Sequence, residues 1–547
     1  MPANFDPTTI EDLTLRQAFI FLLNQIESQA AHLQALQQEN QTLRDENNRL
    51  KGEQGQPKIQ PNKKQANISS EKERHAKKPR PAKARRAHYQ TITRTQTLRV
   101  TKDLLPPDVI HKGYEEVVVR ELRFERETIC FRREKYYSPS QQRIYLADLP
   151  PGFEAGAFGP GVRTLVISLY YEGAMSQPKI EQLLGELGCA VSTGLIAQWL
   201  NDCREFACER SEMERAGLSS TEWQGIDDTA TGVNGVNQVC EVITNPLYTS
   251  YHTVAHKDRH TVLKLLCGHH LQYRFNEEAR ALLTVWKLPK CYLSCLEADW
   301  PYATTLTCSE TEQWLARHLP HLGSQQVSLV WNALGLAYYH WQSEWPVVSL
   351  LVCDDAPQWE WLTAEIGLCW VHEARHYKKL TPHTPYFGAV LATFTESFWH
   401  YYRELLAYQL AATPAEAMRL QDEFERLFSP VTGYQALDQQ IARTRAKQAQ
   451  LLAVLMHPEI PLHNNASELA ARQRVRKRDI SFGPRSEAGA KAWDVFQSLA
   501  ATCRKLGLSF YRYIHSRLSA SDEIAQLGDI ITERASQLNL SASWATL

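Results

Sequence analysis

A heptad repeat between Leu13 and Leu50 is the first hydrophobic pattern along the chain. Leucine at d with asparagine at a is typical of a parallel two-stranded coiled coil, in which a buried amide fixes the register. A single amphipathic helix docked on its own domain would give a similar stripe. We expect the coiled coil and self-association, most simply as a homodimer. The a positions are Phe19, Ile26, Leu33, Asn40 and Asn47, and the d positions are Leu22, Gln29, Leu36, Leu43 and Leu50.

The period changes to two between Tyr114 and Pro150, where branched or aromatic residues alternate with charged ones. This alternation predicts a small antiparallel sheet. The segment that follows, residues 176–202, predicts two helices broken at Gly188, with Ser192 or Thr193 as the cap of the second. Such a pair can be a DNA-binding helix-turn-helix or an ordinary helical hairpin, and the pattern does not separate the two.

Acidic residues interrupt two predicted strand regions further along the chain. The segment WQGIDDTATGV and the β-rich stretch after it predict consecutive antiparallel strands, with Asp227 and Asp228 on the first. A second apolar run ends at Asp354 and Asp355, and we expect a helix to begin near Pro357. A continuous apolar run of this kind predicts a strand buried on both faces, with its carboxylates at the C-terminal end.

A third acidic residue, Glu468, lies early in a predicted helix that the polar pair Asn464 and Asn465 opens. Asp227 and Asp354 are 127 residues apart, and Glu468 follows Asp354 by 114 residues. The second gap is strongly helical in pattern, so we predict a helical insertion domain there.

Three carboxylates on rigid elements suit the chemistry of phosphodiesters. Two Mg²⁺ ions roughly 3.5–4 Å apart can stabilise both the entering and the leaving oxygen of an in-line displacement. Mg²⁺ prefers a few carboxylates and keeps several waters. A chain with 61 acidic residues also contains acidic doublets by chance, and most helical glutamates are simply solvated.

Length, composition and charge extend this picture. A chain of 547 residues is too long for one hydrophobic core, and 43% apolar with 22% charged residues is typical of soluble globular proteins. No apolar run is long enough for a membrane helix, and the first residues do not have the pattern of a signal peptide. The segment from Lys51 to Arg99 carries 14 Lys and Arg against 3 Glu, which predicts a flexible arm that binds a polyanion.

The 12 cysteines are scattered, which favours reduced thiols in a cytoplasm. Cys291 and Cys295, with Cys267, His269 and His270 upstream, could suggest zinc. Their spacing is unusual for a zinc knuckle, so we predict ordinary buried cysteines.

Three motifs carry a resemblance to a known family. The stretch HPEIPLHNNASELAARQRVRKRDISFGPRSEAGAKAW resembles the C-terminal signature of the insertion-sequence sixty-six (IS66) family of bacterial transposases: Asn-Asn-x-x-Glu, an Arg-Lys-rich stretch and a Phe-Gly turn. The stretch LLVCDDAPQWEWLTAEIGLCWVHEARHYKKL is similar to the family's second-Asp segment, and GIDDTATGVNG to its first. The family's cysteine-rich zinc module is reduced here to Cys130, so that zinc site is expected to be lost.

The resemblance implies a DDE-type DNA transposase that cleaves and joins DNA. It carries the catalytic and metal-binding roles to Asp227, Asp354 and Glu468, with Mg²⁺ as cofactor and Mn²⁺ as a substitute. Adjacent strand residues point to opposite faces, so only one aspartate of each doublet should reach the metal, and the alignment favours the first. A basic run would hold DNA phosphates, unless it is only a solvated face. That run is Arg472, Arg474, Arg476, Lys477 and Arg478.

His372 and Arg375 lie on one face of the helix after the second Asp, where they could orient substrate or a water outside the metal's own ligands, or simply take part in packing and surface pairing. The expected fold class is an α/β ribonuclease-H-like core with a helical insertion. The expected partners are DNA ends and target, a second copy of the chain, and possible accessory transposition proteins, without a membrane, in a bacterial cytoplasm and at the nucleoid when DNA is bound. Two alternatives stay open: a non-catalytic DNA-binding relic of a transposase, and a nuclease that cleaves without joining.

We predict eight segments in chain order. They are a coiled coil (residues 1–52), a basic linker (53–100), a small β module (101–152), a helix-turn-helix-like region (153–218), the first part of the core with an insertion (219–380), a helical insertion (381–455), the Glu-bearing part of the core (456–520) and a tail (521–547).

Overall fold

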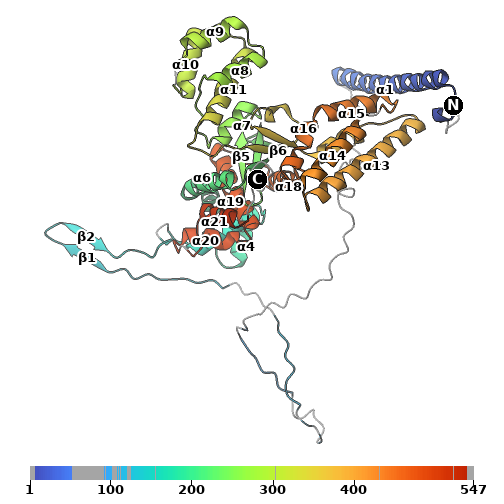
Figure 1. The fold of residues 1–547 in the computed structure, drawn as a ribbon. Helices are drawn as coiled ribbons and strands as arrows, with labels where there is room; N and C mark the ends of the chain where they lie inside the picture. The colour runs from blue at the N-terminus through green and yellow to red at the C-terminus, as the bar shows by residue number, and fades with distance from the viewer. Residues whose placement is uncertain are drawn as a thin grey trace.

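The computed structural model describes residues 6–51, 92, 94–100, 108, 110, 112–119, 125–153, 156–301, 304–429, 431–521 and 523–538. The fold is mixed α/β with a majority of helix (Figure 1). Nearly all of the predicted basic linker and the end of the predicted tail lie outside the described residues. Within them, no helix is long and apolar enough to cross a bilayer.

A five-stranded mixed sheet forms the centre of the molecule, with strand order β5-β4-β3-β6-β7. The first three strands in sequence are antiparallel neighbours, as predicted, and β6 and β7 run parallel to β3. Asn234 and Gly235, both with positive φ, make the tight turn between β3 and β4. The strands are β3 (Trp223–Val233), β4 (Val236–Thr244), β5 (Thr249–Val254), β6 (Leu350–Cys353) and β7 (Glu365–Leu368).

Two helices, α18 (Asn465–Ser481) and α19 (Glu487–Lys505), pack on one face of this sheet. On β5, Tyr251 points to that face and its hydroxyl donates to the Ala470 carbonyl at 3.0 Å. The next residue, His252, points to the opposite face, as the pleat requires, and meets Arg210 of α6 (Arg204–Ser219) at 3.0 Å. Helices therefore cover both faces of β5.

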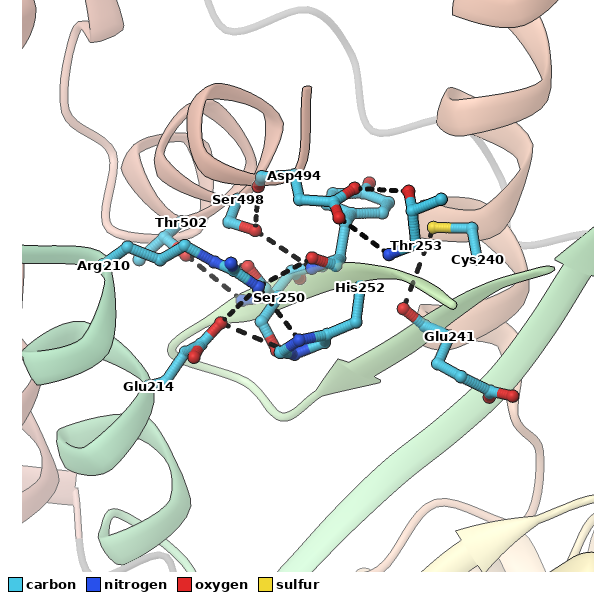
Figure 2. Close-up of polar contacts among 12 residues, drawn as sticks. Arg210, Glu214, Cys240, Glu241, Ser250, His252, Thr253, Asp494, Ser498 and Thr502 are labelled. Carbon is cyan, nitrogen blue, oxygen red and sulfur yellow. Dashed lines mark hydrogen bonds and ion pairs between the residues drawn. The ribbon is translucent and has the colours of Figure 1, made fainter. Parts of the chain in front are cut away.

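A buried polar network joins α18, α19 and β5, and Figure 2 shows the part of it in which Asp494 of α19 meets Thr253 of β5. The Asp494 carboxylate accepts from the Thr253 backbone N–H at 2.7 Å and from its hydroxyl at 2.8 Å. Arg474, only 1% exposed, donates to the same carboxylate at 2.8 Å. The prediction that Arg474 binds DNA is therefore wrong for this structure, because its guanidinium is enclosed and already paired.

Lys477 is enclosed as well. It is 2% exposed, and its Nζ lies 3.1 Å from the centre of the Tyr170 ring. Burial lowers its pKa to about 7. This environment contradicts the predicted phosphate contact by Lys477 and makes the residue part of the packing between α18 and α3 (Pro160–Tyr171).

The predicted pair of short helices is confirmed as α4 (Gln177–Glu186) and α5 (Thr193–Asn201). Gly188 at the break has a φ of 75°, a conformation that favours glycine. Ser192 caps α5 by accepting from the Leu195 N–H at 3.3 Å. Ile196 and Leu200 anchor the helix in the core, which leaves Gln198 exposed.

Two sets of helices extend from the sheet (Figure 1). The first lies between β5 and β6 and comprises α7 (Arg259–Leu266), α8 (Glu277–Val285), α9 (Lys290–Asp299), α10 (Cys308–His318) and α11 (Ser324–Trp341). The second lies between β7 and α18 and comprises α12 (Trp370–Lys378), α13 (Pro385–Tyr408), α14 (Pro414–Phe428), α15 (Gln435–Ala446), α16 (Gln448–Leu451) and α17 (Ala453–Met456). Two further helices, α20 (Phe510–Leu518) and α21 (Leu527–Leu538), complete the C-terminal part.

One local prediction needs correction. No α-helix begins near Pro357: the chain makes the short 3-10 helix η3 (Pro357–Trp359) and then strand β7. The predicted small antiparallel sheet is confirmed, within the described residues, as one hairpin of β1 (Lys135–Ser138) and β2 (Arg143–Leu146), which projects away from the helices (Figure 1). Its strands are largely exposed, so alternation of apolar and charged residues there does not mark a buried face.

The N-terminal helix α1 (Leu13–Leu50) follows the 3-10 helix η1 (Pro7–Thr9) and docks on the second set of helices. Glu27 is buried, and its carboxylate accepts from the backbone N–H groups of His383 and Thr384 at 2.7–2.9 Å. These N–H groups lie at the start of α13, where a negative charge is favourable. The heptad positions lie on a different side: Leu36 is 46% and Leu43 59% exposed.

We predict that Arg474→Met destabilises the protein, because it leaves the Asp494 carboxylate buried without its cation. Breaking a buried ion pair from one side costs about 3–5 kcal/mol. The loss should appear as a lower midpoint of urea unfolding. The exposed neighbour Arg472 provides the control, since Arg472→Met should change stability by less than about 0.5 kcal/mol. Equal stability of the two variants would contradict the structural role of Arg474.

Candidate active site

Asp227 and Asp354 come from neighbouring parallel strands at the centre of the sheet. Gly225 of β3 pairs with Val352 of β6. Each aspartate follows its paired residue by two positions, so the two carboxylates lie at the same level and can point to the same face. Asp227 lies within β3, and Asp354 directly follows β6.

Glu468 reaches this level from the first turn of α18. The Asn464 side-chain amide donates to the Ile226 carbonyl at 2.6 Å, which attaches the start of the helix to β3 beside Asp227. A Cβ atom at Gly225 would lie 2.8 Å from Ser467 Oγ, so this close approach needs glycine. Strand β3 and helix α18 are thereby held in contact at the position of the carboxylates.

Negative charge accumulates where the three residues meet. The pKa of Asp227 is raised to about 7, first by burial and then by the neighbouring carboxylate of Glu468, with a smaller contribution from Asp354. The Asp228 N–H, which donates to Asp227 Oδ1 at 3.0 Å, opposes the shift only in part. The structure therefore places Glu468 and Asp354 close enough to Asp227 for their charges to disfavour its ionised form.

The pleat separates Asp227 from Asp228. Asp227 pairs with Val242, whose side chain packs against α18. Asp228 pairs with Glu241, so its side chain lies on the opposite face of the sheet. Asp228 Oδ2 accepts from Lys257 Nζ and from Gln358 Nε2, each at 3.3 Å. The geometry thus favours Asp227 as the member of the doublet that meets Glu468.

The two aspartates of the second doublet, Asp354 and Asp355, have different hydrogen-bond partners. Asp355 Oδ2 accepts from Lys447 Nζ at 2.7 Å and lies 3.2 Å from His376 Nε2, and these two groups hold its pKa well below the usual range. Asp354 Oδ1 instead accepts from the indole N–H of Trp359 at 2.6 Å. Asp355 is therefore engaged by cations, and Asp354 is oriented by a neutral donor.

Glu468 has basic neighbours on α12. Arg375 donates to its two carboxylate oxygens at 3.0 and 3.3 Å, and His372 Nε2 lies 3.6 Å from Oε1. The pKa of His372 is lowered, first by burial and then by the Arg375 charge. Both residues thus contact the Glu468 carboxylate, an arrangement that the sequence did not predict.

The basic residues of α18 lie on two different faces of the helix. Arg472 and Arg476 are exposed, and Arg478 is half-buried with Nη1 donating to the Ala230 carbonyl. Arg474 and Lys477 face inward, as described above. Only the outward-facing members remain available to a phosphate.

Glu241, Trp359 and Lys447 were not recognised as site residues from the sequence. Glu241 is fully buried, and neither of its carboxylate oxygens has a hydrogen-bond partner in the part of the chain that the structure describes. Burial, and then the Asp228 charge, raises its pKa to about 8. Figure 2 shows its side chain directed away from His252. In sequence it is an ordinary polar residue between apolar strand positions, and only the strand register reveals its closeness to Asp228.

The residues present fit a hard divalent cation. All three predicted ligands offer carboxylate oxygens, and the carboxylates of Glu468 and Asp354 repel a charge on Asp227, which adds to the rise in its pKa caused by burial. A cation such as Mg²⁺ would relieve that repulsion.

The raised pKa of Asp227 predicts a pH-dependent stability in metal-free buffer. The folded state binds this proton more tightly than the unfolded state, so stability contributed here is present below about pH 4 and is lost as pH rises towards 7. Asp227→Asn should therefore increase the free energy of unfolding at pH 8, by on the order of a few kcal/mol, but not at pH 4. Melting temperatures measured at the two pH values check this.

Asp355→Asn is the matched comparison, because its pKa shift has the opposite sign. That variant should lose stability at pH 8. A melting temperature for Asp227→Asn that follows the wild type at every pH would contradict the electrostatic picture of the site.

Comparisons with known proteins agree with the motifs that surround this site. The family model described as "Transposase IS66 family" matches residues 347–492, a range that contains Asp354 and Glu468. The "Uncharacterized protein y4jO" of Sinorhizobium fredii (strain NBRC 101917 / NGR234) is 31% identical over 326 residues, which are 59% of this chain and 100% of that protein. No solved structure matches the chain. On its sequence motifs and this family match, the chain belongs to the IS66 family of transposases.

Proposed function

We propose that this transposase is a DDE-type enzyme that cleaves DNA at the ends of an insertion sequence and joins the freed 3′ ends to target DNA. Asp227, Asp354 and Glu468 are its catalytic residues and would hold Mg²⁺, for which Mn²⁺ would substitute. The observation that carries the proposal is that Asp227 and Asp354 lie at one level of two neighbouring parallel strands, beside Glu468. Burial raises the pKa of Asp227 first, and the carboxylates of Glu468 and Asp354 raise it further.

A ribonuclease-H-like core is part of the proposal. The strand order β5-β4-β3-β6-β7 supports it, since three antiparallel strands are followed by two strands parallel to the first. In this arrangement β3 is the central strand, and it carries Asp227 between the strand with Asp354 and the helix with Glu468. The two sets of helices are then insertions in that core.

When bound, the metal ions would supply Lewis-acid stabilisation of the attacking and leaving oxygens. The chain's own residues position the carboxylates for this. Trp359 orients Asp354 through its indole N–H, and Arg375 fixes Glu468. Lys447 and His376 keep Asp355 occupied, so that a single carboxylate of the doublet is available.

DNA would be held by the outward face of α18. Arg472 and Arg476 are exposed on the helix that bears Glu468, so they can reach phosphates near the scissile bond. The helix pair α4 and α5 is the proposed reader of the element ends, with the exposed side of α5 towards the major groove. The basic linker of residues 53–100 would add contacts that do not depend on sequence.

The exposed heptad face of α1 supports pairing of two copies. Glu27 and Leu23 dock the helix on its own chain, whereas Leu22, Leu36 and Leu43 remain exposed on another side. A second copy of α1 can cover these leucines without displacing the docked face. A dimer of this kind would bring two element ends together, at the nucleoid and with accessory proteins where these are required.

The first test is strand transfer of labelled element-end DNA with Mg²⁺ or Mn²⁺, with DNA binding measured in parallel. Asp227→Ala, Asp354→Ala and Glu468→Ala should each reduce joining to background while binding persists, because each removes an oxygen ligand. Asp355→Ala serves as the neighbour variant and should keep measurable joining.

The outcomes separate the alternatives. Joining that survives Asp354→Ala but not Asp355→Ala would transfer the ligand role by one residue. Cleavage without joining would indicate a nuclease. Specific binding without any metal-dependent chemistry, in the presence of accessory proteins, would indicate a DNA-binding relic and contradict the proposal.

The second test concerns assembly. The double variant Leu36→Glu, Leu43→Glu places charges in the proposed seam and should convert a dimer into a monomer of 62.6 kDa, as measured by light scattering after gel filtration. Thr42→Glu, on the same exposed helix but at a c position, should remain dimeric. A wild-type chain that is monomeric at micromolar concentration would contradict pairing through α1.

A further inference from the structure

Three side chains of different metal-binding types meet in the first set of helices, away from the three carboxylates of the proposed catalytic centre. Cys295 and Asp299 lie four residues apart on one face of α9, and His318 lies at the end of α10. One ligand atom from each residue lies within 4.8 Å of the other two. Helices α9 and α10 form the outer part of the first set of helices (Figure 1).

Their spacing suits a tetrahedral ion. Cys295 Sγ lies 3.4 Å from Asp299 Oδ2, and His318 Nδ1 lies 3.6 Å from the same oxygen. Around a zinc ion with bonds of about 2.0–2.3 Å, neighbouring ligand atoms are separated by roughly 3.3–3.8 Å. Both distances fall in that range, and the ligand atoms of Cys295 and His318 lie within 4.8 Å of each other.

The orientation of His318 is fixed by a neighbour. Its ring stacks on Trp314 with centroids 4.6 Å apart and planes inclined by 8°. The Trp314 indole N–H in turn donates to the Asp299 carbonyl at 3.3 Å. One tryptophan thus connects the helix that carries His318 to the residue that supplies the carboxylate. Such support from surrounding groups is typical of metal sites.

We propose that Cys295, Asp299 and His318 form a binding site for zinc or a similar borderline-soft divalent ion, with water in the fourth position. A thiolate, an imidazole and a carboxylate together favour Zn²⁺ over Mg²⁺, so this site and the catalytic centre select different ions. Binding breaks the S–H bond of Cys295, the thiolate bonds to the metal, and the proton passes to solvent.

The ion would connect α9, which has few buried residues, to the better-packed α10. Leu296 is the one fully buried residue of α9, whereas α10 buries Thr311, Trp314 and Leu315. A metal shared by α9 and α10 would join the ends of the two helices across the segment between them. The predicted role of Cys295 as an ordinary buried cysteine is corrected, because its side chain is only half-buried and lies beside two other ligands.

The test is Co²⁺ titration of the full-length, metal-stripped protein in reducing buffer, followed by absorption. One Co²⁺ per chain should produce a thiolate-to-cobalt charge-transfer band, and stoichiometric Zn²⁺ should abolish it. Cys295→Ser should lose the band, and His318→Ala and Asp299→Asn should reduce both its intensity and the affinity. Zn²⁺ should raise the melting temperature of the wild type but not of Cys295→Ser.

Cys308→Ser is the matched control, since Cys308 is an exposed cysteine of α10 outside this cluster, and it should keep the band. Absence of a thiolate band in the wild type, or an unchanged band in Cys295→Ser, would overturn the proposal. Should Cys295→Ser fail to fold, an unchanged band in both His318→Ala and Asp299→Asn would overturn it. The result is independent of strand transfer, because the catalytic carboxylates cannot give a thiolate band.

Discussion

Three carboxylates are held close together at the centre of the sheet, and packing has to overcome their mutual repulsion. The contacts that oppose this repulsion are made by α18 with β3, α19 and β5. Asn464 attaches the start of α18 to β3, and the buried pair of Arg474 and Asp494 attaches the middle of α18 to α19 and β5. Because Asn464 precedes Glu468 and Arg474 follows it, each within about two helical turns, the helix cannot swing away from Asp227 without breaking these bonds. The charge cluster is thus a strained feature of a well-packed region.

In each Asp-Asp doublet, the two aspartates have different roles. Asp228 and Asp355 each have a lysine partner, Lys257 and Lys447 respectively, whereas the preceding aspartate points towards the shared centre. The second member of each doublet balances cations that belong to neighbouring elements. A lysine partner therefore distinguishes an acid that stabilises the fold from one that is proposed to bind a metal.

Much of the sheet was predictable because its signals are local. The antiparallel strands, the buried run before Asp354 and the helix that begins beside Asn464 all follow from period and caps. The inward face of α18 was not predictable, because it carries Ser467, Ala470, Arg474 and Lys477 at helical spacing instead of large apolar residues. A buried stripe of that composition cannot be distinguished from a solvated basic face until its partners, Asp494 and Tyr170, are known. Likewise, β7 has only four residues, too few for alternation to be recognised. The meeting of His318 with Cys295 depends on how α9 and α10 fold back on each other.

The docking of α1 has a consequence for geometry at the scale of the whole assembly. Glu27 attaches α1 to the start of α13, in the same block of helices from which Lys447 reaches Asp355, one residue from Asp354. If two chains pair through the free side of α1, that block of helices connects each proposed catalytic centre to the symmetry axis. The distance between the two centres is then set by helix packing rather than by the bound DNA. The stagger between the two cuts in a target duplex would accordingly be a constant of the protein, the same at every site it enters.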